Sequence, residues 1–387
     1  MPFDLPIDVI IACYNGEPWL VDTMDSIFAQ TRRPASIVVV DDGSGDGSVE
    51  LIAARYPAVC LERTSRRGAS GARNHGLRKT ESPYVIFMDQ DDLWHPRHLE
   101  ILHGLLQRHP HSALAATSSR EFLDGDRPHF DTRREEPRMF DPWLTYPSHG
   151  FNCIPAVSLF RRRPLEEIGA CPEDHEPMPD YSLWMRLSMT RPIPVSQACS
   201  AAHRRHGKSH TARLTSDRLG YSETCLRVDR DLLDGLSSCP GVSEARKKQA
   251  GVRYRMAIGF HEFAKSPLVA TAEQRSTIAD IDAALAAETP PYRRAFLRHF
   301  VAWMPYERFD PAAICTALLD RWPVGATKNE LESVIAERLP AFPDLWRFLD
   351  LGASFSPHRL RVTVRTLARR AMARLRRCLR SRGRRER

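Results

Sequence analysis

The sequence predicts an α/β fold: a doubly wound, mostly parallel sheet with helices on both faces, followed by a helical C-terminal module. Two observations support this prediction. Over the first 110 residues, short continuous apolar runs alternate with segments of helical periodicity, as expected for strands that are covered on both faces. From about residue 215 to 355 the pattern is helical and is punctuated by prolines. The sequence has no run of 18 apolar residues, so we expect no helix that spans a membrane.

The first region predicts four strands in chain order: DVIIAC (8–13), SIVVVD (36–41), AVCLER (58–63) and YVIFMD (84–89). Between them the spacing predicts helices over 18–30, 48–56 and 71–79. Strands that alternate with helices form parallel sheets, and ligands of such sheets bind at the carboxyl ends of the strands. The polar residues of this region gather at those ends.

The rest of the chain defines further expected parts. A second buried run, CIPAVSLF, lies within about 145–195 and precedes a charged segment. We therefore predict a first domain over 1–212, with one part at 1–110 and a second part at 111–212. An all-helical module is predicted at 213–357, and a basic amphipathic tail at 358–387.

The cysteines and the N-terminal residues indicate the cellular compartment in which we expect the protein. The nine cysteines are scattered, odd in number and never spaced as Cys-x-x-Cys, which disfavours a disulfide framework and a zinc site. The first residues carry acids rather than a basic region, and their apolar stretch is too short for a secretory signal. Both observations favour a reducing cytoplasm.

The fourth strand ends in Asp89, Gln90, Asp91 and Asp92, where three carboxylates crowd into four positions. If the strand continues, Asp89 and Asp91 point one way and Asp92 the other. Such a group suits Mg²⁺ or Mn²⁺ completed by substrate phosphates. A solvated acidic loop, a helix cap by Asp92 or a phosphatase-type Asp-x-Asp nucleophile are alternatives. An EF-hand is excluded because Leu93 and Trp94 occupy two of its required positions.

The second strand ends in VVVDDGSGDGS, which places Asp41 and Asp42 before a glycine-rich turn. A carboxylate there can accept a hydrogen bond from a base N–H or a ribose hydroxyl, although turn chemistry alone explains the glycines. The sequence has neither the dinucleotide-binding glycine pattern at the first strand nor a P-loop. SRRGASGARNHG (65–76) predicts a flexible loop whose arginines, Arg73 included, suit a pyrophosphate or are ordinary surface residues.

Four segments, in this order and spacing, closely resemble the inverting family-2 glycosyltransferases of GT-A fold: IIACYNGEPWLVDTMDSIFAQT, IVVVDDGSGDGS, GASGARNHGL and VIFMDQDDLWHP. The resemblance covers roughly residues 7–210 and implies that 1–110 is the nucleotide-binding part and 111–212 the acceptor-binding, catalytic part. It extends to IGACPEDHEPMPDYSLWMRL, in which Asp180 matches the general base and Trp184 and Arg186 follow at the family's spacing. Two departures are Pro179 in place of a glutamate and Ala170-Cys171-Pro172 in place of Gly-Phe-Asp.

The resemblance implies a role for each site residue. Asp180 would be the catalytic base, Asp42 would read the nucleotide base, and Asp89 or its neighbours would hold the ribose. Asp91, with Asp92, would coordinate the metal that bridges the diphosphate, and His206 of the Arg204-x-His206 motif would contact the metal or the diphosphate. The set expected to bind the nucleotide-sugar is Ala12, Tyr14, Asn15, Asp41, Asp42, Arg73, Asp89 and Gln90.

The implied activity is transfer of a sugar from a nucleoside diphosphate sugar, with a UDP-sugar the expected donor, to a hydroxyl of a glycan or lipid-linked acceptor. Surface polysaccharide synthesis is the family-level expectation. The alternatives are a nucleotidyltransferase or phosphotransferase on a related sheet, and a catalytically silent nucleotide-sugar-binding or scaffold protein. Five aspartates, at 42, 89, 91, 92 and 180, argue against the silent protein.

The tail carries most of the positive charge. Residues 359–387 hold 13 arginines and one glutamate, a net charge of +12, which against +8 for the whole chain leaves −4 for the remainder. Apolar residues recur every three or four positions over 358–380, as in a basic amphipathic helix on an anionic membrane surface. No aromatic residue lies in 356–387, which disfavours nucleic acid. A helix packed on the preceding module is the remaining alternative.

Overall fold

A computed structural model describes residues 5–141, 155–175, 178–190, 192–208, 218–268, 272–302 and 311–338. These residues form two compact units. The first unit holds the described residues up to 208 together with 230–247, and the second holds 218–229 and 248–338. Each unit has its own buried cluster.

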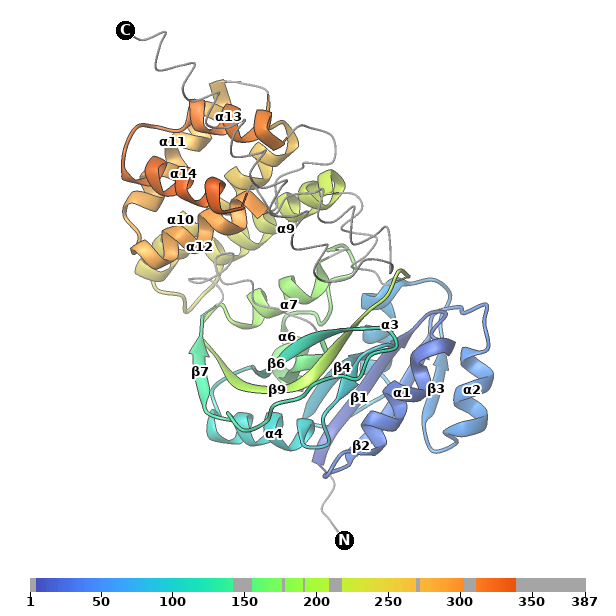
Figure 1. The fold of residues 1–387 in the computed structure, drawn as a ribbon. Helices are drawn as coiled ribbons and strands as arrows, with labels where there is room; N and C mark the ends of the chain where they lie inside the picture. Colours follow the sequence, from blue (N-terminus) through green and yellow to red (C-terminus); the bar gives the residue numbers. More distant parts are fainter. Residues whose placement is uncertain are drawn as a thin grey trace, which may run out of the picture. The chain divides into compact units, whose positions relative to one another are not determined.

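The first unit is built on a mixed sheet in which, among the described residues, nine strands take part. The strand order is β3-β2-β1-β4-β8-β6-β9-β5, and β7 also pairs with β9 (Figure 1). The strands are β1 (Leu5–Cys13), β2 (Pro34–Asp41), β3 (Cys60–Arg63), β4 (Tyr84–Asp89), β5 (Leu93–Trp94), β6 (Leu114–Leu123), β7 (Pro137–Phe140), β8 (Ser158–Arg161) and β9 (Ile193–Arg205).

The first four of these strands are parallel, as the sequence predicts. Strand β8 enters antiparallel between β4 and β6, β9 runs parallel to β6, and β5 and β7 are antiparallel to β9. Of these antiparallel strands, β7 and β8 come from the second half of the unit, whereas β5 directly follows β4. The fold class is therefore confirmed as an α/β sheet whose N-terminal half is parallel.

Helices cover both faces of this sheet. They are α1 (Glu17–Phe28), α2 (Ser48–Arg55), α3 (Gly68–Leu77), α4 (His98–Arg108), α6 (Arg162–Glu167) and α7 (Pro179–Leu187). Adjacent residues of a strand point to opposite faces. On β2, Val39 belongs to the main cluster with Leu20 and Met24 of α1, whereas Val38 and Val40 pack against Ala72 of α3.

One expected boundary is wrong in a way that matters for the site. The sequence predicts a flexible loop over 65–76 with a helix from 71, but α3 begins at Gly68. Arg73 is therefore a helical residue, and its side chain is only 4% exposed. Glycine and serine lower the helix propensity of this segment, and burial against the sheet overrides that tendency.

The second unit is helical, as predicted. Its helices are α9 (Arg218–Ser238), α10 (Glu244–Lys265), α11 (Ala272–Ala286), α12 (Pro290–Ala302), α13 (Pro311–Arg321) and α14 (Ala326–Arg338), of which α9 and α10 also run into the first unit. Its core is aromatic, and Phe260, Phe300 and Trp322 lie close to one another in it. Within the described residues we find no helix long and apolar enough to cross a membrane. The predicted tail, 358–387, lies outside the described residues.

Candidate active site

The candidate site is built where β1, β2 and β4 end side by side. Ala12 lies opposite Asp89, and Cys13 opposite Asp41, in the parallel register. The backbone N–H of Asp42 donates to the carbonyl of Cys13 across 2.8 Å, so the two chains stay paired as they leave the sheet. This edge is the ligand-binding edge of a parallel sheet.

Tyr14 is held by its backbone. Gln90 accepts a hydrogen bond at Oε1 from the Tyr14 N–H (2.8 Å) and donates from Nε2 to the Tyr14 carbonyl (3.1 Å). Gly16 is needed for this arrangement, since a Cβ there would lie 2.5 Å from Gln90 Oε1. The Tyr14 ring is exposed, and the guanidinium of Arg66 lies 4.3 Å from its centre. Gln90 therefore positions Tyr14, a role that the sequence did not predict.

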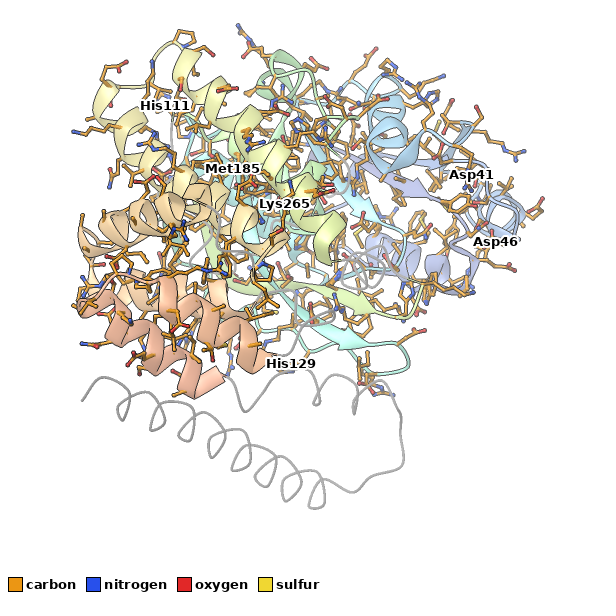
Figure 2. The ribbon with its side chains drawn as sticks, turned by 90° about the horizontal axis from the view of Figure 1, so that it is seen from above. Asp41, Asp46, His111, His129, Met185 and Lys265 are labelled. Atoms are coloured by element: carbon orange, nitrogen blue, oxygen red, sulfur yellow. The ribbon has the colours of Figure 1, made fainter. Side chains whose placement is uncertain are left out.

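The loops after β1 and β2 are tied together. Asn15 adopts a positive φ of 52°. Its N–H donates to Ser44 Oγ (2.9 Å), and its Oδ1 accepts from the Gly45 N–H (2.8 Å). Asp41, the last residue of β2, is buried and accepts from the Ser44 N–H. Asp41 and Asp46 are both labelled in Figure 2. Asn15 and Asp41 thus shape the loop around the site.

Asp42 has a nearly complete set of partners. Its Oδ1 accepts from Thr64 Oγ1 (2.7 Å) and from the Arg67 N–H (2.8 Å), and its Oδ2 accepts from the Gly68 N–H (2.8 Å). The Asp42 carboxylate therefore accepts hydrogen bonds from N–H groups at the N-terminus of α3. The arginines of this segment were predicted to suit a pyrophosphate. Carboxylate oxygens can accept further hydrogen bonds, so recognition of a nucleotide base by Asp42 stays a prediction.

Arg73 joins two parts of the predicted site. Its Nη1 donates to Asp180 Oδ1 (2.8 Å) and its Nη2 to Asp89 Oδ1 (2.7 Å). Burial by itself would lower the pKa of Arg73, but Asp180 and Asp89 outweigh it and raise that pKa. The arginine therefore stays charged between the two carboxylates.

Asp180 lies in the first turn of α7, after Pro179 at the helix start. Two further α7 residues fix the helix: Trp184 Nε1 donates to Ser158 Oγ (2.8 Å), and Arg186 donates to the carbonyl of Ile168. Trp184 is fully buried. These anchors explain why Trp184 and Arg186 accompany Asp180 in sequence, since they hold the helix that presents it.

Asp91 and Asp92 have different surroundings. Strand β4 ends at Asp89, so strand alternation does not extend to these two residues. Asp91 Oδ2 lies 2.8 Å from His206 Nε2, and the His206 ring stacks on Trp19. Asp92 is fully buried, and its Oδ1 accepts from the Arg204 N–H (3.1 Å) and lies 3.0 Å from His203 Nδ1. Asp92 therefore bonds to β9 and does not cap α4.

The pKa shifts show how crowded this acidic group is. Burial, and then the carboxylates of Asp92 and Asp89, raise the pKa of Asp91 from its ordinary 3.8 to about 6. Burial also raises the pKa of Asp92. Burial lowers the pKa of His203, but Asp92 more than compensates and brings it to about 9. Without a further cation, the ionised forms of both aspartates are disfavoured.

These residues fit a divalent cation only in part. Across the described ranges, no group of three or more His, Cys, Asp or Glu side chains is arranged to hold a metal. Asp91 and His206 offer two adjacent ligand atoms, and the buried Asp92 Oδ2 has no hydrogen-bond partner among the described residues. Mg²⁺ is commonly bound by one or two carboxylates, with phosphates and water completing the shell. Asp91 with His206 is the better-placed pair, and Asp92 as a ligand stays a prediction.

Sequence reasoning missed His203 and understated Arg204. Arg204 is nearly fully buried and donates to the Asp91 carbonyl (2.9 Å), Asp124 Oδ1 (2.9 Å) and Asp22 Oδ2 (3.0 Å). The signal in the sequence that could have revealed both residues is the strand pattern of 193–205, which precedes His206. Since that strand lies beside β5 in the sheet, its last residues reach the aspartates after β4.

The fold defines the class: a GT-A-type α/β domain, here with an acidic group at the carboxyl ends of its parallel strands. Residues 8–169, less than half of the chain, match the model of the family described as "Glycosyl transferase family 2". A crystal structure of residues 1–349 of S. aureus TarS with UDP-GlcNAc has a TM-score of 0.54 at 18% identity, covering 85% of this chain and 91% of that one. At that identity the likeness shows the fold alone.

Curated relatives match over shorter segments. An uncharacterized glycosyltransferase of Rickettsia felis is 24% identical over 232 residues, 57% of this chain and 36% of the relative. The Escherichia coli enzyme UDP-Glc:alpha-D-GlcNAc-diphosphoundecaprenol beta-1,3-glucosyltransferase WfaP is 32% identical over 90 residues, 23% of this chain and 36% of the relative. The chain thus spans about a third of the length of these two relatives.

Proposed function

We propose that the protein is a metal-dependent inverting glycosyltransferase that moves a sugar from a nucleoside diphosphate sugar to a hydroxyl of a glycan or lipid-linked acceptor. One observation carries the proposal. Asp180 is the residue that matches the family's base. It accepts a hydrogen bond from the guanidinium of Arg73, which also donates to Asp89 at the proposed donor-binding edge. A carboxylate so placed is adjacent to a donor bound over the strand ends.

The donor is proposed to be a UDP-sugar. The name of WfaP specifies UDP-glucose as donor and a diphosphoundecaprenol-linked sugar as acceptor, which supports this choice and a lipid-linked acceptor for the present chain. Tyr14 offers an exposed ring on which a base can stack, and Asp42 lies at the next strand end. The basic segment 358–387 would bring the enzyme to the inner face of an anionic membrane.

The proposed chemistry is a single displacement. Asp180 accepts the proton of the acceptor hydroxyl while that oxygen forms a bond to the anomeric carbon. The bond from that carbon to the diphosphate oxygen breaks, and its electron pair leaves with the nucleoside diphosphate. A cation held by Asp91 and His206 would stabilise the negative charge on this leaving group. Attack from the opposite face inverts the anomeric configuration.

The test is thermal unfolding with UDP, GDP, CDP and dTDP, each with and without Mn²⁺, for the wild type and Asp91→Ala. A ligand at a hundred times its Kd adds about 2.7 kcal/mol to the unfolding free energy. We expect a Mn²⁺-dependent shift with UDP that is lost in Asp91→Ala. Absence of a shift with every nucleotide would contradict the proposal and favour a silent scaffold.

The base is tested separately. Asp180→Asn should bind UDP like the wild type. With water as the acceptor hydroxyl, it should release UDP from a UDP-sugar at least 100-fold more slowly, which is within the range attributed to general base catalysis. Turnover of the variant at the wild-type rate would eliminate Asp180 as the base. Transfer of a nucleotide instead of an intact sugar, read by mass spectrometry, would identify a nucleotidyltransferase.

A further inference from the structure

Helix α3 contacts the ends of β2 and β4, the first turn of α7 and the segment before α7. At its N-terminus the N–H groups of Arg67 and Gly68 hold Asp42. One turn later Arg73 bridges Asp89 and Asp180. The next residue, Asn74, donates to the Cys171 carbonyl (2.9 Å) and accepts from the Cys171 N–H (3.0 Å). A single helix therefore connects the donor-binding edge with the segment that leads to α7.

The Arg73 side chain is fixed by the two carboxylates. It is 4% exposed, and its Nε has no hydrogen-bond partner among the residues that the structure describes. A buried N–H without a partner costs about 1–3 kcal/mol. The guanidinium thus takes the orientation that serves Asp89 and Asp180, although one of its own donors is left unpaired.

This arrangement requires an arginine. Two of its nitrogens reach two carboxylates from separate elements, at 2.7 and 2.8 Å. A lysine would keep the charge but has only one nitrogen, and it lacks the planar fork that holds two acceptors in a fixed geometry. Arg73→Lys therefore separates the charge of the residue from its geometry.

We propose that Arg73 is a positioning residue that acts through Asp180: it fixes the proposed base relative to the carboxylate at Asp89, and so relative to the bound donor. This inference rests on the proposed function. It differs from direct binding of the donor phosphates by Arg73, the role implied by the sequence. Each Nη atom already donates one N–H to a carboxylate, and the Kd for UDP tests whether the remaining N–H groups bind the phosphates.

The test is a double-mutant cycle of Arg73→Lys and Asp180→Asn. Two quantities are measured for each protein: the Kd for UDP with Mn²⁺ by calorimetry, and kcat for UDP release from a UDP-sugar. We expect Arg73→Lys alone to lower kcat about 100-fold, as a misplacement near 1 Å can, with the UDP Kd within threefold of wild type. In the Asp180→Asn background the same change should alter kcat less than threefold, because the residue through which it acts is gone.

A matched control is Arg55→Lys on α2, where the arginine pairs with Asp25 at the surface. It should leave kcat and Kd unchanged. The inference is overturned if Arg73→Lys weakens UDP binding more than tenfold, because Arg73 would then be a phosphate ligand. It is also overturned if Arg73→Lys lowers kcat by the same factor in the Asp180→Asn background as in the wild type. A wild type that releases no UDP from any UDP-sugar would instead overturn the proposed function.

A second comparison tests the inference if Arg73→Lys does not fold, that is, if it does not unfold cooperatively. The double variant Arg73→Gln/Asp180→Asn is then compared with Asp180→Asn. The double variant removes the charge of Arg73 together with the charge of one of its partners. Equal residual kcat and equal UDP affinity support action through Asp180. A further loss of either quantity contradicts it.

Discussion

Asp89, Asp91 and Asp92 are near neighbours in sequence, yet each has a different side-chain partner in the structure. Arg73 pairs with Asp89, His206 with Asp91, and His203 with Asp92. The crowding of three carboxylates, which repel one another when buried, favoured a cation among them. The sequence could not predict these partners, two of which are more than 110 positions away in the chain.

A buried histidine near the site gives a pH-dependent prediction. His98 is fully buried, stacks on Trp94 and has its Nδ1 2.8 Å from Ser200 Oγ. Burial lowers the pKa of His98 from its ordinary 6.5 to about 3. Between these two values the unfolded chain binds a proton that the folded chain does not, so the unfolding free energy falls as the pH falls through this window.

His98→Gln removes this titration. We expect the wild type to lose more stability than the variant between pH 7 and pH 4, by at most about 3.5 kcal/mol. Urea unfolding of both proteins at a series of pH values measures the difference. Parallel stability curves for the two proteins would show that His98 is not the group responsible.

At the scale of elements, the alternation of short apolar runs with helical periods was sufficient to predict β1 to β4 and the helices between them. It misplaced the start of α3, which was predicted at residue 71 and lies at Gly68. The reason for another glycine of this helix, Gly76, is visible only in three dimensions. A Cβ on Gly76 would lie 2.5 Å from Ile10 Cγ2 and 3.2 Å from Val40 Cγ2.

Gly76→Ala should therefore destabilise the protein, by about 1–3 kcal/mol, because added carbon in a packed core forces its neighbours to move. Gly104→Ala on α4 is the matched control. A Cβ there would meet only the flexible end of Arg108, at 3.4 Å, so the gain in helix propensity should dominate. Chemical denaturation of the two variants should shift in opposite directions, and a stabilising Gly76→Ala would contradict the close packing of α3 on the sheet.

At the scale of the whole molecule, the sequence predicted a sheet domain, a helical module and a tail of opposite charge. The sheet and the helices are present, but the inserted antiparallel β8 was not predicted. Long-range pairing of strands is decided by contacts that local patterns do not encode. The same holds for the site, where the strand ends were predicted and the pairing of Arg73 with Asp180 was not.

The charge of the tail gives a prediction for the full chain. Thirteen arginines in 359–387 should bind vesicles that contain phosphatidylglycerol but not vesicles of phosphatidylcholine alone, and salt should weaken the binding. Co-sedimentation of the full chain and of a chain that ends at residue 357 measures this. Equal binding by both chains would show that the tail is not the membrane contact.

The placement of β9 has a consequence for the order in which the protein is made. This strand pairs with β5, β6 and β7, and it leads to His203, Arg204 and His206. A ribosome delivers Asp91 and Asp92 more than 100 residues before it delivers these partners. Until then the nascent chain holds its carboxylates without the groups that bond to them. Completion of the acidic site is thus tied to the last strand of the sheet, and the edge proposed to bind the donor cannot reach its final form on a partly synthesised chain.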